Sequence, residues 1–140
     1  MSVKVTVKDY TPQLIRKNQL AVKQAVQDCT DDLKNVAIGS APHWKGRLEK
    51  GITTTFLNSS SYVEGKVGVS VIEKGYDYGQ LRHDHPFNLG EKSRKKQGGK
   101  SGISGKSFSV GNGFISSPAE ANRSAYLNHI EKIFIDEVCD

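Results

Sequence analysis

The stretch SAPHWKGRLEKGI, residues 40–52, marks the place where the chain changes from one hydrophobic pattern to another. Before it, apolar residues recur every three or four positions, whereas after it they tend to alternate with polar ones. Ala41 and Pro42 predict the end of a helix, because proline cannot continue one. Gly46 permits a sharp reversal of the chain, and Leu48 is expected to begin the buried face of a hairpin. The stretch therefore predicts a junction between a helix and a sheet.

Upstream of this junction, the sequence predicts a strand and a long helix. Residues 1–9 alternate between valine and polar residues, which is typical of a strand or an extended arm. Thr11 and Pro12 are a good N-cap and a good first helical residue. The helix is expected to run from about residue 12 to residue 38, with Gly39 as its stop. Its apolar face is expected to contain Ile15, Val22, Val26, Cys29, Leu33 and Val36.

Downstream, residues 46–73 predict an antiparallel hairpin, with a turn at residues 58–61 and a break in its second strand near Gly65 or Gly68. Residues 76–89 are aromatic and irregular, which is typical of a short edge strand followed by a loop. A return strand is expected between Phe108 and Ile115.

The last helix is predicted to begin with the capping box formed by Ser117, Pro118, Ala119 and Glu120, and to reach about residue 138. Its apolar face is expected to contain Tyr126, Ile130, Ile133, Phe134 and Val138. The predicted fold is one α+β domain spanning residues 1–140. It has a long N-terminal helix, an antiparallel sheet, and a long C-terminal helix packed on one sheet face.

The positive charge of the chain is concentrated in one segment. Residues 91–106 hold six bases and one acid, Glu91, a difference equal to the net charge of +5 of the whole chain. The bases are Lys92, Arg94, Lys95, Lys96, Lys100 and Lys106. Because this segment is also rich in glycine, we predict a flexible basic loop at about residues 90–107. Such a loop either keeps the protein soluble or contacts a phosphate backbone or an acidic protein face.

Composition and motifs argue against several classes of protein. No apolar run reaches the length of a membrane span, and the first residues lack the apolar core of a signal peptide.

The spacing of Cys29 and Cys139 favours two reduced core thiols. Trp44 is expected to be a packing or interface anchor.

The sequence offers no recognisable catalytic centre, and we predict no cofactor and no enzymatic activity. Phosphate-binding, dinucleotide-binding and serine-nucleophile motifs are absent from the sequence. His83, Asp84 and His85 are the only ligand-like cluster, and their spacing makes a poor metal site, which favours a polar loop. A metal-dependent nuclease that uses His83 and His85 is the weakest of the hypotheses kept.

Two motifs carry a resemblance to a known family. Residues 40–52 resemble the Ala-Pro and Gly-Arg-Leu signature that follows the first helix in head–tail connector and tail-completion proteins of long-tailed phages. Residues 114–119 resemble the family's Phe-Leu-x-x-Pro-Ala motif before its last helix. The matching residues are Ala41, Pro42, Gly46, Arg47, Leu48, Phe114, Pro118 and Ala119.

The resemblance implies a structural protein of the virion, made in the host cytoplasm and placed in the neck or tail. It implies a homo-oligomeric ring, with a hexamer expected, between portal-side and tail-tube proteins, with DNA passing through the lumen. The family includes tail terminators, stoppers and minor capsid proteins, and all three roles stay open. The basic loop is expected to contact neighbouring subunits, the adjoining ring or DNA. The alternative function is that of a small basic module that binds nucleic acid without regard to sequence.

Overall fold

The computed structural model describes residues 2–7, 12–43, 46–59, 62–85 and 89–139. The larger elements are β1 (Ser2–Val7), α1 (Pro12–Ser40), β2 (Ile52–Asn58), β3 (Val63–Val69) and α6 (Arg123–Cys139). The short helices are α2 (Arg47–Lys50), α3 (Tyr78–Asp84), α4 (Glu91–Arg94) and α5 (Ser116–Ala121). Two small hairpins are formed by β4 (Ile72–Glu73) with β5 (Tyr76–Asp77), and by β6 (Gly99–Lys100) with β7 (Ser107–Phe108).

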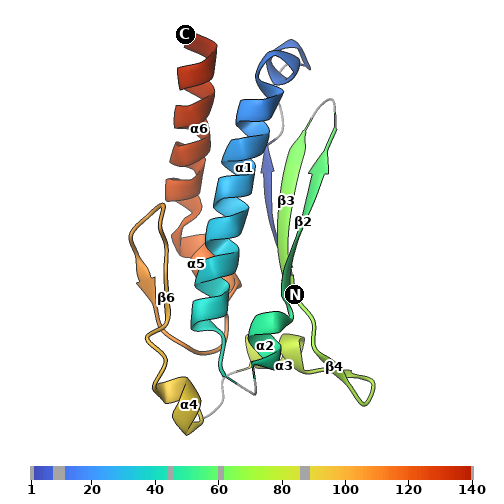
Figure 1. Ribbon diagram of the computed structural model, residues 1–140, viewed down its shortest axis with the longest axis vertical. Coiled ribbons are helices and arrows are strands. Elements are labelled where there is room, and N and C mark those ends of the chain that lie inside the picture. Colours follow the sequence, from blue (N-terminus) through green and yellow to red (C-terminus); the bar gives the residue numbers. More distant parts are fainter. Residues whose placement is uncertain (1, 8–11, 44–45, 60–61, 86–88, 140) are drawn as a thin grey trace.

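The predicted α+β fold with two long terminal helices is confirmed (Figure 1). The main sheet is antiparallel with the strand order β1-β3-β2, so the predicted N-terminal strand and the predicted hairpin join in one sheet. Helix α1 packs against all three strands, while α6 packs mainly along α1 and the short helix α5 contacts β1. The structure thus places α1 between the sheet and the last helix.

The hydrophobic core lies between α1, the sheet and α6. The predicted face of α1 is buried at Val22, Val26, Cys29, Leu33 and Val36. Val63, Val67 and Val69 of β3 face this helix, and Tyr126 and Ile130 of α6 cover it from the other side. Cys29 is a buried free thiol as predicted, and burial raises its pKa to about 12. The predictions for Thr11 and Trp44, and for the side chains of Ile15, Phe134, Val138 and Cys139, lie outside the described part of the structure.

Two glycines that were expected to interrupt elements instead allow close approaches. Strand β3 runs without a break through Gly65, and a Cβ at that position would collide with Thr30 of α1. Helix α1 continues through Gly39 to Ser40, and a Cβ on Gly39 would collide with the backbone of Gly99. Gly65 therefore leaves room for the Thr30 side chain, and Gly39 leaves room for the backbone of Gly99.

The junction after α1 differs in part from its prediction. Gly46 has a φ of +73°, so the predicted reversal is confirmed. Leu48, however, does not begin a strand: it is buried within the short helix α2, and β2 begins only at Ile52. Arg47, Leu48, Glu49 and Lys50 are all good helix formers, which explains the extra turn of helix.

The second half of the chain contains three further corrections. Residues 78–84 form the helix α3, capped by the Asp77 carboxylate, where a loop was expected. The predicted return strand is limited to Ser107–Phe108, and the chain then turns through Gly113, whose φ is +70°. Ser117 is not an N-cap, since α5 already begins at Ser116 and carries no side-chain cap. Among the described residues, no helix is both long and apolar enough to cross a membrane.

Candidate assembly surfaces

The basic segment is anchored to the C-terminal end of α1 by Lys96. The Lys96 ammonium donates to the carbonyl oxygens of Ile38 at 3.0 Å and Ala41 at 2.6 Å, and to Glu49 Oε1 at 2.9 Å. These contacts occupy all three donors of an ammonium group. A cation is also favoured at this end of a helix, where the last carbonyls are unpaired. Lys96 is therefore a structural anchor and not one of the solvent-facing bases that the sequence predicted.

Serine side chains fasten the same segment on both sides of Lys96. Ser93 Oγ accepts from the backbone nitrogen of His43 at 2.8 Å and donates to the His43 carbonyl oxygen at 3.3 Å. The backbone nitrogen of Gly99 donates to Ser40 Oγ at 3.1 Å. A Cβ on Gly99 would collide with the Val36 carbonyl oxygen, so only glycine lets β6 lie directly on α1.

A polar cluster centred on Asp32 of α1 holds the hairpin of β6 and β7. The Asp32 carboxylate accepts from Ser101 Oγ at 2.6 Å, from the Gly102 nitrogen at 2.7 Å and from the Tyr126 hydroxyl at 2.7 Å. Burial, together with the Asp32 carboxylate, raises the pKa of the Tyr126 hydroxyl. Ser104 Oγ extends the cluster by donating to Asn122 Oδ1 at 2.7 Å. The cluster joins the segment to both long helices.

The segment at about residues 90–107, predicted from its composition to be a flexible loop, contains a helix, a small hairpin and buried hydrogen bonds to α1. The side chains of four of its bases are exposed to solvent: Lys92, Arg94, Lys95 and Lys100. Lys95 pairs with Glu91 at 3.0 Å, and Lys106 Nζ donates to the Ala121 carbonyl at 2.9 Å. The segment thus presents exposed bases on a fixed backbone.

The residues that carry the family resemblance lie in the core and at junctions. Ala41, Pro42, Leu48, Phe114 and Pro118 are buried, and Ala119 packs against the core. Arg47 is the exception, since its guanidinium reaches solvent and pairs with Glu73 at 2.9 Å. These residues shape the fold and do not form a binding surface.

His83 is a buried residue whose ring nitrogens have partners inside the protein. Its ring is buried against Phe114, with ring centroids 5.0 Å apart. Nδ1 lies 3.0 Å from Asp84 Oδ1, and Nε2 accepts from the Ser116 nitrogen at 3.2 Å, so both ring nitrogens are used inside the protein. In the part of the chain that the structure describes, no three metal-ligating side chains come together. The geometry therefore offers no support for the nuclease hypothesis.

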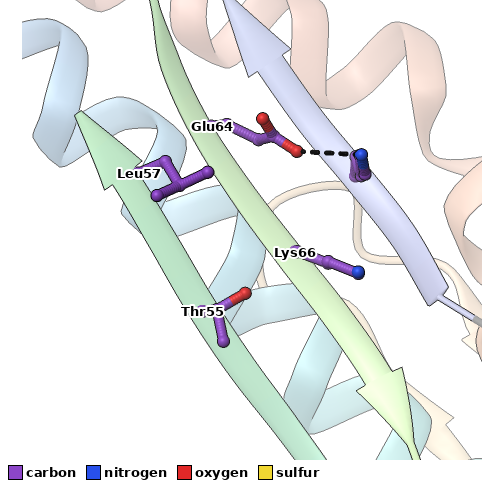
Figure 2. Close-up of a pocket in the computed structure, with 5 residues that line it drawn as sticks. Thr55, Leu57, Glu64 and Lys66 are labelled. Carbon is purple, nitrogen blue, oxygen red and sulfur yellow. Dashed lines mark ion pairs between the residues drawn. The ribbon is translucent and has the colours of Figure 1, made fainter. Parts of the chain in front are cut away.

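The three-stranded sheet has one face turned away from α1 and two edge strands, β1 and β2. In Figure 2, Thr55, Leu57, Glu64 and Lys66 line a hollow on the face turned away from α1. Lys4 also lines it, and its ammonium lies 3.4 Å from Glu64 Oε1. The hollow measures about 260 Å³.

Strand β2 is an edge of this sheet, because β3 is the only described strand that pairs with it. Its side chains Phe56 and Leu57 are 37% and 57% exposed. Successive residues of a strand point to opposite faces, so two adjacent large apolar residues cannot both enter a core on one face. That pair was the sequence signal for an open surface, and the sequence reasoning missed it.

Comparison of the chain with models of protein families, with curated proteins and with solved structures found no match.

Proposed function

We propose that this chain is a non-enzymatic structural protein of a phage neck or tail. In this proposal it joins copies of itself in a ring, with six copies expected, at the head–tail junction through which DNA passes. The ring belongs to the virion, is assembled in the host cytoplasm, and meets portal-side and tail-tube proteins. The two sequence motifs support the family, and the open sheet supports self-assembly.

The observation that carries the proposal is the unpaired edge β2 with its exposed Phe56 and Leu57. An exposed apolar edge strand is a hazard for a monomer, because another chain can add to it. A closed assembly removes that hazard by covering the edge. The sheet also has two different edges, β1 and β2, which run in the same direction because both are antiparallel to β3. Head-to-tail contacts between unlike edges generate rings, whereas contacts between identical edges generate dimers.

Electron microscopy and light scattering of the purified chain test the proposal. We expect annular particles from the wild-type chain, and fewer of them from Leu57→Lys, which places a charge on the open surface. Leu127→Lys is the matched control, because Leu127 of α6 is 56% exposed and lies away from the sheet. A chain that stays monomeric at its highest soluble concentration, both alone and with portal and tail-tube proteins, would contradict the proposal.

The exposed bases of α4 favour one second candidate, sequence-independent binding of nucleic acid. Contacts from lysine and arginine to phosphates weaken steeply as salt rises, because binding releases counterions. The second candidate predicts that monomeric protein binds DNA of any sequence with such a salt dependence. It also predicts that the variant Lys92→Glu, Arg94→Glu loses this binding while no ring forms under any condition.

A further inference from the structure

A second hollow lies beside the small hairpin of β4 and β5, at the end of the molecule that also holds α4. Its lining consists of Tyr76, Asp77, Gln80, Leu81, Asp84 and His85, and it measures about 310 Å³. Tyr76 is 54% exposed, and its ring meets that of Tyr78 edge to face, with centroids 5.7 Å apart. The neighbouring Ile72 is 63% exposed. The hairpin thus combines exposed apolar surface with an adjacent polar hollow.

The hollow carries negative charge at neutral pH. The hydrogen bond from His83 holds the pKa of Asp84 below its usual value, and the Asp84 side chain is 36% exposed. Burial alone would raise the pKa of Asp77, but hydrogen bonds from the nitrogens of Val71, Gln80 and Gly79 outweigh it and lower the pKa. The hollow therefore suits a cationic partner, although Asp77 already uses one carboxylate oxygen to cap α3.

The same chain supplies a surface of opposite charge. Helix α4 exposes Lys92 and Arg94, and neither forms an ion pair with any residue that the structure describes. Ser93 and Lys96 fasten this helix to the end of α1, so the backbone that carries Lys92 and Arg94 is anchored. An arginine can pair with a carboxylate through two parallel hydrogen bonds and can stack on a tyrosine ring.

The positions of the two surfaces point to a head-to-tail contact. Figure 1 shows α4 and the hairpin of β4 projecting from opposite sides of the same, lower end of the molecule. In a ring each copy meets one neighbour on each of its two sides, so the two surfaces would meet two different neighbours. Unlike surfaces at the same level on opposite sides are what a ring requires.

We propose that α4 of one copy binds the hollow beside β5 and α3 of the next copy, with Lys92 and Arg94 facing Asp84 and Tyr76. This inference rests on the proposed ring and names one of its subunit contacts. Charge complementarity selects the neighbour and the register, while the apolar hairpin excludes water around the contact.

Charge reversal tests this contact in the full chain. Lys92→Glu combined with Arg94→Glu should weaken self-association about tenfold or more, because like charges then face each other. Adding Gln80→Lys and Asp84→Lys to that variant should restore rings. A second rescue with Gln80→Lys alone keeps the Asp84–His83 contact intact, and it should restore part of the association. Lys100→Glu with Lys132→Glu is the control, since it changes the net charge equally on exposed residues outside α4.

Each other outcome has a defined meaning. Rings that form normally in the α4 variant would overturn this contact and leave the proposed function standing. Loss of rings in the Lys100, Lys132 control as well would trace the effect to net charge and also overturn the contact. Loss that neither rescue reverses, accompanied by loss of DNA binding, would assign α4 to DNA instead. A wild-type chain that forms no ring with or without its expected partners would contradict the proposed function itself.

Discussion

The basic segment, residues 91–106, and the three-stranded sheet differ in how far each is held by contacts with the rest of the molecule. The segment contains short elements and many exposed charges, yet its backbone is fastened to α1 through Ser93, Lys96, Gly99 and the Asp32 cluster. The sheet is paired in regular antiparallel register, yet its outer face and its edge β2 have no partner within the described chain. Exposed charge is therefore compatible with a rigid backbone, and regular pairing is compatible with an unfinished surface. The comparison separates residues that hold the fold from residues that are free to meet a partner.

The largest expected effect is that of removing the carboxylate at the centre of the polar cluster. Asp32→Ala should lower the free energy of unfolding by about 3 kcal/mol, because the Ser101 hydroxyl, the Gly102 nitrogen and the Tyr126 hydroxyl lose their acceptor. Chemical denaturation measures this change. Asp31→Ala is the control, since Asp31 is exposed on the same helix. Equal stability of both variants would show that the segment is not held by this cluster.

A methyl group between β6 and α1 should be the next most damaging change. Gly99→Ala places a Cβ against the Val36 carbonyl oxygen, and we expect a loss of about 2 kcal/mol through overpacking. Gly90 lies just before the same segment, and a Cβ there would meet no other atom. Gly90→Ala should therefore change the free energy of unfolding by less than about 0.5 kcal/mol. Equal melting temperatures for the two variants would contradict the close approach of β6 to α1.

Neutralising the anchor lysine should have a smaller effect. Lys96→Met removes three hydrogen bonds at the end of α1 and should cost about 1.5 kcal/mol. Lys95→Met removes only an exposed pair with Glu91 and should cost less than about 0.5 kcal/mol. Amide hydrogen exchange distinguishes the two variants best, because exchange at the last turn of α1 should become faster only in the Lys96 variant. Faster exchange in both variants would refute the distinct role of Lys96.

The smallest effect on stability is expected on the open sheet. Leu57→Lys should leave the free energy of unfolding within about 0.5 kcal/mol of the wild type, because Leu57 is already 57% exposed. Leu48→Ala, at a position only 1% exposed, should cost about 3 kcal/mol in the same assay. A large loss at Leu57 in the monomer would mean that this side chain supports the fold and is not available to a partner.

Local patterns in the sequence predicted the larger elements correctly. The valine alternation of residues 2–7 indicated β1, and the apolar spacing from Val22 to Val36 indicated the buried face of α1. Both patterns work because burial on one side imposes a fixed period on the chain. The same reasoning failed at Leu48, where four helix-forming residues outweighed the expected strand.

The glycines show why composition alone did not reveal how the basic segment is fastened. A run with Gly98, Gly99, Gly102 and Gly105 has the composition of a flexible linker. Gly99 is required because it meets Val36, more than sixty residues earlier in the chain, and no local rule can report such a contact. The anchoring roles of Lys96 and Asp32 could not be predicted either, because their hydrogen-bond partners are distant in the sequence.

The sequence by itself determined that the chain has an α+β fold with two long helices, an antiparallel sheet and its positive charge in a single segment. These properties depend on hydrophobic periodicity and on composition, which are set by residues close together in the sequence. Only the tertiary structure decided that the basic segment is fastened, that Lys96 is an anchor while Lys92 and Arg94 face solvent, and that β2 is an open edge. Those outcomes depend on which distant surfaces meet, because a side chain is buried or left exposed by whatever packs against it.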